Sequence, residues 1–406
     1  MTLTAETRPA VELTRLRTLR TRVRNVLKMF PEEAVNRQVH PMLSPAAWHV
    51  GHTHFVESLW LRERVLGDGA DLADHASLYL PERCPKTERG TRLPSIDRLL
   101  TWCDDMSAAA DSAWELAYAR RQRHGMIGDH YLLGFLIQHY AQHLETLRMA
   151  QQAWAIAEPT PDASGHPLRS RAADFTWLST PEQSLEPGHA PGCAAPYDNE
   201  LGAHRVRLPA FQIATRPVSN GQWLAFMESG GYERAEWWTA SGWSWRQSLQ
   251  TPWPMHWRGD RGDWLAVQPD GSAAPPKQDA PVYGISQHEA LAFATWAGAR
   301  LPHELEWLAA RPQLDQVSEV WEWCENALYP FPGFRPFPYP EYTLPWCDGR
   351  HAVLKGGSRW TEPDIRRDSF RNFYTPDMRH IFAGLRLARS ETDLPANCAD
   401  RRTSTE

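Results

Sequence analysis

The amino-acid sequence predicts a two-domain protein in which an α-helical domain precedes an α+β domain. Residues 12–157 carry apolar side chains at helical spacing in four long runs. Residues 158–174 are polar and rich in Pro, Gly and Ser, which is typical of a linker. Residues 175–390 hold 15 of the 20 tryptophans and mostly short strand-like runs, as expected of an irregular α+β domain. We expect residues 391–406 to form a frayed polar tail.

The composition bounds the class of protein. The 406 residues are enough for two domains with their own cores. The net charge of −6 provides no basic surface for nucleic acid or for an anionic membrane, so we expect neither partner. No apolar run could span a bilayer, and the N-terminal stretch lacks a signal-peptide core, which predicts a cytoplasmic protein. The six cysteines have no C-x-x-C spacing and are interpreted as free thiols. The sequence does not determine the oligomeric state.

The helical domain is predicted to be a four-helix bundle. Its helices are expected over residues 11–30, 45–66, 94–117 and 129–157. Ser44 is the expected N-cap of the second helix, with Pro45 at the first helical position. Bundles of this kind can build metal sites from inward-facing side chains.

Two stretches of the second domain have clear secondary structure. A helix is predicted over residues 286–299, "SQHEALAFATWAGA", and strands over residues 204–214, "HRVRLPAFQIA". Long Gly- and Pro-rich loops separate these stretches from the rest of the domain. We find no repeat of fixed period in the chain.

The stretch "HYAQHLE" places His139 and His143 four residues apart on the apolar face of the last bundle helix. Side chains at i and i+4 lie one above the other, so both imidazoles can face one metal ion. In "WHVGHTHF", His52 shares the inward face of the second helix, whereas His54 faces elsewhere and His49 lies on the same broad face.

A three-histidine site on His52, His139 and His143 would leave about three of six octahedral positions open. Glu145 and Gln142 could support the ligands or contact a substrate. Zinc is possible on ligand chemistry, and hydrogen-bonded core histidines without a metal are the alternative interpretation.

Long motifs of the second half carry a resemblance to a known family. They are "YDNELGAHRVRLPAFQIATRPVSNGQWLAFMESGGY", "PVYGISQHEALAFATWAGARLPHELEW", "VWEWCENALYPFPGFRPFPYPEY", "VLKGGSRW" and "FRNFYTPDMRHIFAGLRLAR". With the histidine motifs, they resemble the ergothioneine-biosynthesis sulfoxide synthases. In that family a DinB-like four-helix bundle precedes a formylglycine-generating-enzyme (sulfatase-modifying) domain of C-type-lectin-like fold. Formylglycine generation itself is not expected, because Ser369 and no cysteine stands in "RRDSFRNF".

The resemblance implies an Fe(II) site on the three histidines and a reaction that consumes O2. The implied imidazole substrate is hercynine, the N-alpha-trimethyl derivative of histidine. Its implied contacts are Gln142, Tyr342, Asn372 and Phe373, whose amide, phenol and aromatic groups suit a carboxylate and a quaternary ammonium. Tyr339 matches the tyrosine that supplies a proton or hydrogen bond near the iron, although Tyr339 and Tyr342 could exchange roles.

The segment "NFYTPDMR" departs from the family pattern. Tyr374 stands where many members have an aspartate, and Met378 where they have the first of two arginines. Losing both charges removes the partners of a zwitterionic thiol donor. This departure resembles a branch of the family, the selenoneine synthases, whose donor is the selenosugar 1-seleno-N-acetylglucosamine.

Two other functions remain open at this point. The first is an ergothioneine-type sulfoxide synthase that couples hercynine to cysteine or gamma-glutamylcysteine. The basic loop "ERCPKTERGTRLP", with Lys86, Arg89 and Arg92, would then bind the donor carboxylate, unless it is only a solvated charge cluster. The second is a carbohydrate-binding module whose histidines hold a structural metal. Oxygen consumption with Fe(II) and hercynine would distinguish an enzyme from such a module.

Overall fold

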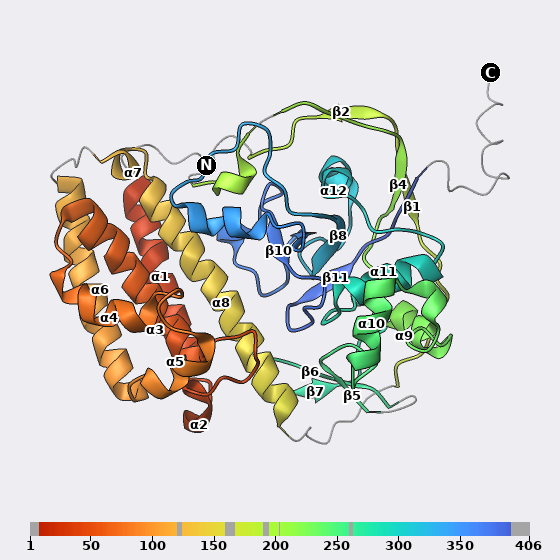
Figure 1. Ribbon diagram of the computed structural model, residues 1–406, viewed down its shortest axis with the longest axis horizontal. Coiled ribbons are helices and arrows are strands. Elements are labelled where there is room, and N and C mark those ends of the chain that lie inside the picture. Colours follow the sequence, from red (N-terminus) through yellow and green to blue (C-terminus); the bar gives the residue numbers. More distant parts are fainter. Residues whose placement is uncertain are drawn as a thin grey trace.

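Two packed units make up the structure, a helical bundle and an α+β domain (Figure 1). This computed structural model describes residues 8–119, 124–158, 167–189, 195–202, 204–259 and 263–390. The long helix α8 (Tyr131–Ala157) runs along the boundary between the units, so one of its faces belongs to each. The order of helices followed by mixed strands and helices confirms the predicted fold class. None of the helices in the described ranges is long and apolar enough to cross a membrane.

Four long helices form the bundle, as the apolar periodicity predicts. They are α1 (Arg8–Leu27), α3 (Ala46–Ser58), α6 (Ile96–Ala119) and α8. Every residue of α3 is buried, and the helix continues as a π-helical segment, Leu59–Leu66. Inside the bundle, the Glu57 carboxylate of α3 accepts hydrogen bonds from Arg20 (2.9 Å), Trp114 (3.1 Å) and Tyr140 (3.0 Å). This buried network ties the other three long helices to α3.

The start of α3 differs from the prediction. Pro45 is the N-cap residue, with φ −53° and ψ 146°, and the first helical residue is Ala46. Ser44 makes no cap hydrogen bond, so its prediction as the cap was wrong. Its hydroxyl instead accepts a hydrogen bond from the buried guanidinium of Arg89. A buried guanidinium needs hydrogen-bond acceptors. The Ser44 hydroxyl serves as one of them for Arg89, and it does not cap α3.

Short helices connect the long ones. They are α2 (Glu32–Val35), α4 (Ala73–Tyr79), α5 (Lys86–Arg92) and α7 (Gly125–Gly128). The segment predicted as a basic loop is therefore mostly helical, as α5. Pro85 immediately before it has φ −55° and ψ 143° and serves as its N-cap residue.

The second domain contains a central mixed sheet of four strands in the order β10-β9-β8-β11. Strands β9, β8 and β10 pair antiparallel, and β11 pairs with β8 in parallel. A second, antiparallel sheet has the order β1-β4-β12. The strands of these two sheets are β8 (Trp321–Ala327), β9 (Ala352–Lys355), β10 (Asn372–Tyr374), β11 (Ala383–Leu385), β1 (Trp177–Thr180), β4 (Phe211–Ala214) and β12 (Ala388–Ser390).

Two small antiparallel sheets, four α-helices and several short 3-10 helices complete the described part of this domain. The predicted strand stretch 204–214 forms β3 and β4, and the predicted helix 286–299 forms α11, with the Ser286 hydroxyl accepting from the Glu289 N–H as a cap. The remaining elements are β2 (Gln183–Leu185), β3 (Val206–Leu208), β5 (Trp257–Arg258), β6 (Leu265–Val267), β7 (Ala273–Ala274), α9 (Asn220–Glu228), α10 (Ala240–Ser248), α11 (Gln287–Trp296) and α12 (Glu304–Ala310).

The predicted linker and tail lie partly or wholly beyond the described ranges. Residues 167–174 contain no helix or strand, and residues 159–166 and 391–406 are outside the described residues. The domain limits therefore stay predictions. Polar contacts nevertheless join the units directly: Arg15 of α1 donates to Asp364 at 3.1 Å, and Gln152 of α8 donates to the Val267 carbonyl at 2.6 Å.

Candidate active site

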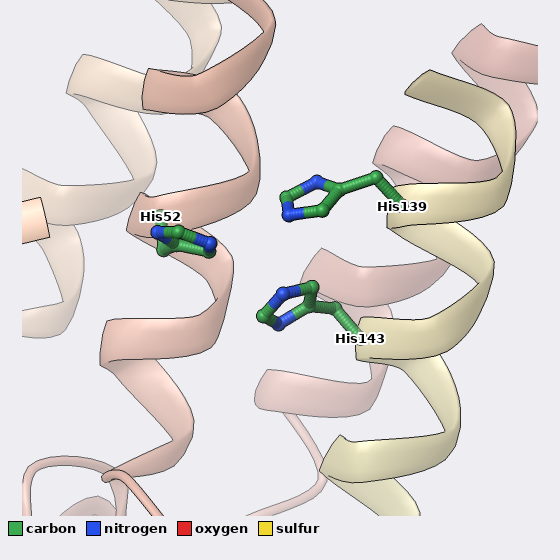
Figure 2. A group of neighbouring side chains, drawn as sticks. All are labelled: His52, His139 and His143. Carbon is green, nitrogen blue, oxygen red and sulfur yellow. The ribbon is translucent and has the colours of Figure 1, made fainter. Parts of the chain in front are cut away.

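Three histidines converge between two helices of the bundle. His52 extends from α3, and His139 and His143 extend toward it from α8 (Figure 2). The ring centroids are 5.1 Å apart for His52 and His139, 4.8 Å for His52 and His143, and 4.5 Å for His139 and His143. One ligand nitrogen from each ring lies within 4.8 Å of the other two. The structure thus brings the three predicted metal ligands together.

The environment keeps these imidazoles in the form that binds metals. Nδ1 of His52 lies 2.7 Å from the Tyr79 carbonyl oxygen, which can only accept, so Nε2 keeps its lone pair. Gly51 allows this approach, because a Cβ there would lie 2.3 Å from the Tyr79 ring. Burial lowers the pKa of His52 to about 4 and holds the pKa values of His139 and His143 well below the usual range. Neutral, closely spaced nitrogen donors fit a divalent transition metal.

A cavity of about 310 Å³ adjoins the triad at the boundary of the two domains. Its wall includes all three histidines, so a metal held there could also bind substrates from the cavity. The other residues that line it are Gln142, Glu145, Thr146, Met149, Trp321, Tyr339, Tyr342, Ile365, Phe370, Asn372 and Tyr374. No lysine or arginine is among these described lining residues. Glu145 is the one carboxylate among them.

Gln142 is held in place by two tyrosines of the second domain. Its amide oxygen accepts a hydrogen bond from the Tyr197 hydroxyl at 2.7 Å, and its NH2 group lies 3.4 Å from the Tyr342 hydroxyl. The rings of Tyr197 and Tyr342 stack at 4.1 Å. Burial raises the pKa of Tyr342 well above its usual range and that of Tyr339 to about 12, so both phenols stay protonated at neutral pH.

Glu145 joins the bundle to the second domain. Its carboxylate accepts hydrogen bonds from Trp321 (2.9 Å), Ser358 (2.6 Å) and Thr361 (2.8 Å). Burial raises the pKa of this carboxyl, and the three hydrogen bonds oppose that shift. The arrangement fixes α8 against the central sheet, and so sets the distance between the histidine triad and the cavity wall on the other domain.

The three predicted substrate contacts on strand β10 point to opposite faces of the central sheet. Asn372 and Tyr374 line the cavity, whereas Phe373 between them contacts the cluster around Cys324 and Val353 on the opposite face. Successive side chains of a strand point to opposite faces, so the three cannot all reach one ligand. Met378, four residues beyond Tyr374, packs against the main hydrophobic core and is not among the residues lining the cavity.

The predicted basic residues lie away from the cavity wall. Arg89 of α5 is 4% exposed, donates to the Cys84 carbonyl at 2.9 Å, and lies over the ring of Trp48 at 3.8 Å. Arg92 donates to the Ser77 hydroxyl at 3.0 Å. Lys86 donates to a backbone carbonyl of the bundle at 2.9 Å. These contacts give all three cations a structural role within the bundle.

Sequence reasoning missed several residues around the site. Tyr197, Trp321 and Phe370 come from separate segments of the second domain, and no local spacing links them to the histidines. His49 is different. Its Nδ1 lies 3.0 Å from Nδ1 of His143. Because His49 and His52 are three residues apart on one helix, their spacing alone could have predicted that His49 lies near the metal site.

Known protein families match both halves of the chain. A model of the DinB superfamily matches residues 15–147, and a model of the sulfatase-modifying factor enzyme 1-like domain matches residues 178–313 and 313–391. The hercynine oxygenase of Mycobacterium tuberculosis is 31% identical over an alignment that covers 92% of this chain and 96% of the relative. The chain belongs to the hercynine oxygenase family. Its fold is the one predicted, a helical DinB domain followed by an α+β domain like that of formylglycine-generating enzymes.

Two further relatives match different shares of the chain. The hercynine oxygenase of Mycolicibacterium thermoresistibile is 30% identical and covers 88% of this chain and 90% of its own length. The formylglycine-generating enzyme of Thermomonospora curvata is 37% identical, but the match covers only 32% of this chain and 46% of that enzyme. The chain is accordingly an enzyme of the oxygenase class, and its histidine triad is consistent with a non-haem iron centre. This result favours an enzyme over a carbohydrate-binding module.

Proposed function

We propose that this protein catalyses the Fe(II)- and O2-dependent joining of the imidazole C2 of hercynine to the selenium of 1-seleno-N-acetylglucosamine, in selenoneine biosynthesis. The observation that carries the choice of donor is the absence of cationic side chains from the cavity wall: the phenol of Tyr374 stands at the position of the family's aspartate, and no lysine or arginine is among the described lining residues. A zwitterionic thiol donor would find no cationic partner there, whereas a neutral sugar needs none.

His52, His139 and His143 are the proposed iron ligands. The fit rests on three neutral imidazoles with ligand atoms within 4.8 Å of one another, one of them oriented by the Tyr79 carbonyl. Bound iron would activate O2, and O2 would supply the oxidising equivalents for bond formation. The cavity of about 310 Å³ beside the triad has room for organic ligands at the open positions of the metal. Holding both substrates side by side lowers the entropic part of the barrier.

Gln142, Tyr342 and Asn372 are the proposed contacts of the hercynine carboxylate. The Tyr197 hydroxyl fixes the amide of Gln142, so its NH2 group is oriented before substrate arrives. The Asn372 side-chain oxygen accepts from the Phe373 N–H at 3.0 Å, which leaves the Asn372 NH2 group to donate. The trimethylammonium group would contact the Tyr374 ring and the other aromatic rings of the cavity wall, and the Glu145 carboxylate would attract its charge. Phe373 contributes indirectly, by anchoring β10.

The donor is proposed to lie against Tyr374. The guanidinium of Arg379, the second arginine of the family pattern, is paired with Glu289 at 3.0 Å and is not available to a substrate. Arg89 and Arg92 are likewise bonded within the bundle. The ergothioneine-type alternative, with cysteine or gamma-glutamylcysteine as donor, would need one of these groups to move. Arg89 and Arg92 are therefore proposed to contact the donor only in the ergothioneine-type alternative.

The two cavity tyrosines should respond differently to loss of their hydroxyls. Tyr339 lines the cavity with a protonated phenol and is the proposed proton donor, so Tyr339→Phe should reduce coupling and increase uncoupled oxidation of the donor. Tyr342→Phe loses one hydrogen bond to the substrate and should mainly raise the KM for hercynine, by about fivefold for about 1 kcal/mol. Product analysis and steady-state kinetics of both variants provide the measurement. If Tyr342→Phe uncouples the reaction and Tyr339→Phe raises KM, the two roles are exchanged.

A panel of donors tests the proposal directly. The Fe(II) enzyme is given hercynine and air with the selenosugar, the corresponding thiosugar, cysteine or gamma-glutamylcysteine, and both O2 consumption and coupled product are measured. We expect the selenosugar to give the highest kcat/KM, because losing each charge-assisted bond costs an amino-thiol donor on the order of 1.5–3 kcal/mol. Preference for cysteine or gamma-glutamylcysteine would establish the ergothioneine-type alternative. Absence of O2 consumption with every donor would contradict an oxygenase activity and favour the carbohydrate-binding module instead.

A further inference from the structure

His49 contacts one of the proposed iron ligands, His143. It lies three residues before His52 on α3, is 6% exposed, and places its Nδ1 3.0 Å from Nδ1 of His143. The centroids of these two rings are 5.1 Å apart, and their planes are inclined by 53°. His49 is not part of the group of ligand atoms within 4.8 Å of one another, which consists of His52, His139 and His143 in the described ranges. It therefore reaches the metal site through His143.

The direction of this hydrogen bond follows from metal binding. A neutral imidazole carries one proton, so His143 can offer Nε2 to a metal only if its Nδ1 is protonated. Nδ1 of His143 must then donate, and Nδ1 of His49 must accept. The proton of His49 is consequently on Nε2, which is buried and has no hydrogen-bond partner among the described residues. An unpaired buried N–H lowers the stability of the fold. In His49 this unpaired N–H is the consequence of accepting the hydrogen bond that fixes the tautomer of His143.

The three ligands are supported in different ways at the nitrogen that faces away from the metal. His52 donates to the backbone carbonyl of Tyr79, and Nδ1 of His139 has no partner among the described residues. Among the described residues, a side chain bonds this nitrogen only in His143, where the partner is His49. The orientation of His143 can therefore be changed by substitution of a single residue that touches neither metal nor substrate.

We propose that His49 is a positioning residue of the metal site, which accepts a hydrogen bond from His143 and so fixes its tautomer and ring rotation. The inference rests on the iron site of the proposed function, not on the identity of the donor. A neutral imidazole is a weaker acceptor than the carboxylates that often support metal-binding histidines. Replacing it by a carboxylate should increase electron donation by His143 and favour the Fe(III) state.

Fe(II) affinity measured without hercynine or donor tests this role. His49→Phe keeps a flat ring but removes the acceptor, and should weaken anaerobic Fe(II) binding by about 10- to 100-fold in competition with a chelator. His49→Asn places an amide oxygen near the position of Nδ1 and should restore most of the affinity. His54→Phe is the matched control, because His54 is also a buried histidine of α3, but its Nδ1 bonds the Val50 carbonyl and its ring packs edge-on against Tyr140. This control should bind Fe(II) like the wild type.

The reduction potential provides a second, independent readout. His49→Asp should lower the Fe(III)/Fe(II) potential relative to both the wild type and His49→Asn, a change that loss of packing alone would not produce. An unchanged potential in His49→Asp, wild-type affinity in His49→Phe, or equally weak binding in His49→Asn and His49→Phe would each overturn the inference. If His49→Phe does not fold, the Asn and Asp variants still decide it. Retention of iron by His139→Ala would instead refute the metal site itself.

Discussion

His139→Ala should lose Fe(II) binding and reduce O2-dependent turnover to background while the chain stays folded. His139 supplies one of only three imidazole ligands in the proposed iron site, and two monodentate ligands hold Fe(II) too weakly to keep it bound. Among the three ligands, His139 gives the clearest test. Its Nδ1 makes no hydrogen bond to the described residues, whereas His52 bonds the Tyr79 carbonyl and His143 bonds His49. The substitution therefore removes a ligand without breaking a hydrogen bond of its Nδ1 to the described residues.

The measurement combines iron content after anaerobic loading with the thermal midpoint of the metal-free protein. We expect the metal-free His139→Ala variant to unfold within a few degrees of the metal-free wild type, since the substitution leaves a space that opens onto the cavity. His54→Ala is the control on α3, because it removes a buried imidazole that faces away from the triad. It should keep its iron even if its thermal midpoint falls. Full iron occupancy in His139→Ala would contradict the assignment of the ligands.

Tyr374→Asp combined with Met378→Arg should shift donor preference from the selenosugar toward cysteine or gamma-glutamylcysteine. The double variant restores a carboxylate for the donor ammonium and a guanidinium for its carboxylate. Each charge-assisted bond stabilises a bound donor by on the order of 1.5–3 kcal/mol, so the ratio of kcat/KM values should change by roughly 10-fold or more. Selenosugar turnover should fall, because Tyr374→Asp replaces a ring that lines the cavity with a carboxylate that a neutral sugar cannot neutralise.

The single variants separate the contributions of the two positions. Tyr374 lines the cavity, whereas Met378 packs against the core beyond it, so Tyr374→Asp alone should produce most of the loss of selenosugar turnover. Met378→Arg alone should have a smaller effect, and should improve amino-thiol turnover only in combination with Tyr374→Asp. Tyr374→Phe is the matched control, since it keeps the ring and introduces no charge. An unchanged donor ratio in the double variant would remove these two positions from the donor site.

The sequence by itself determined those features that depend on neighbours along the chain. The four bundle helices and α11 follow from apolar periodicity. His139 and His143 share a face because four residues make about one helical turn, so their common ligand role was predictable from spacing. The long motifs likewise predicted the family. The DinB match and the sulfatase-modifying match lie in the order that those motifs implied.

Only the tertiary structure decided which side chains reach the cavity. The pairing of β10 with β9 turns Phe373 away from Asn372 and Tyr374, although all three belong to one motif. Packing of α5 buries Arg89 over Trp48, where local composition suggested an exposed or substrate-binding cation. The contact of His49 with His143 joins residues 94 apart in the chain. Helix and strand periods place a side chain on a face, but the partner of that face depends on long-range packing, which no local spacing encodes.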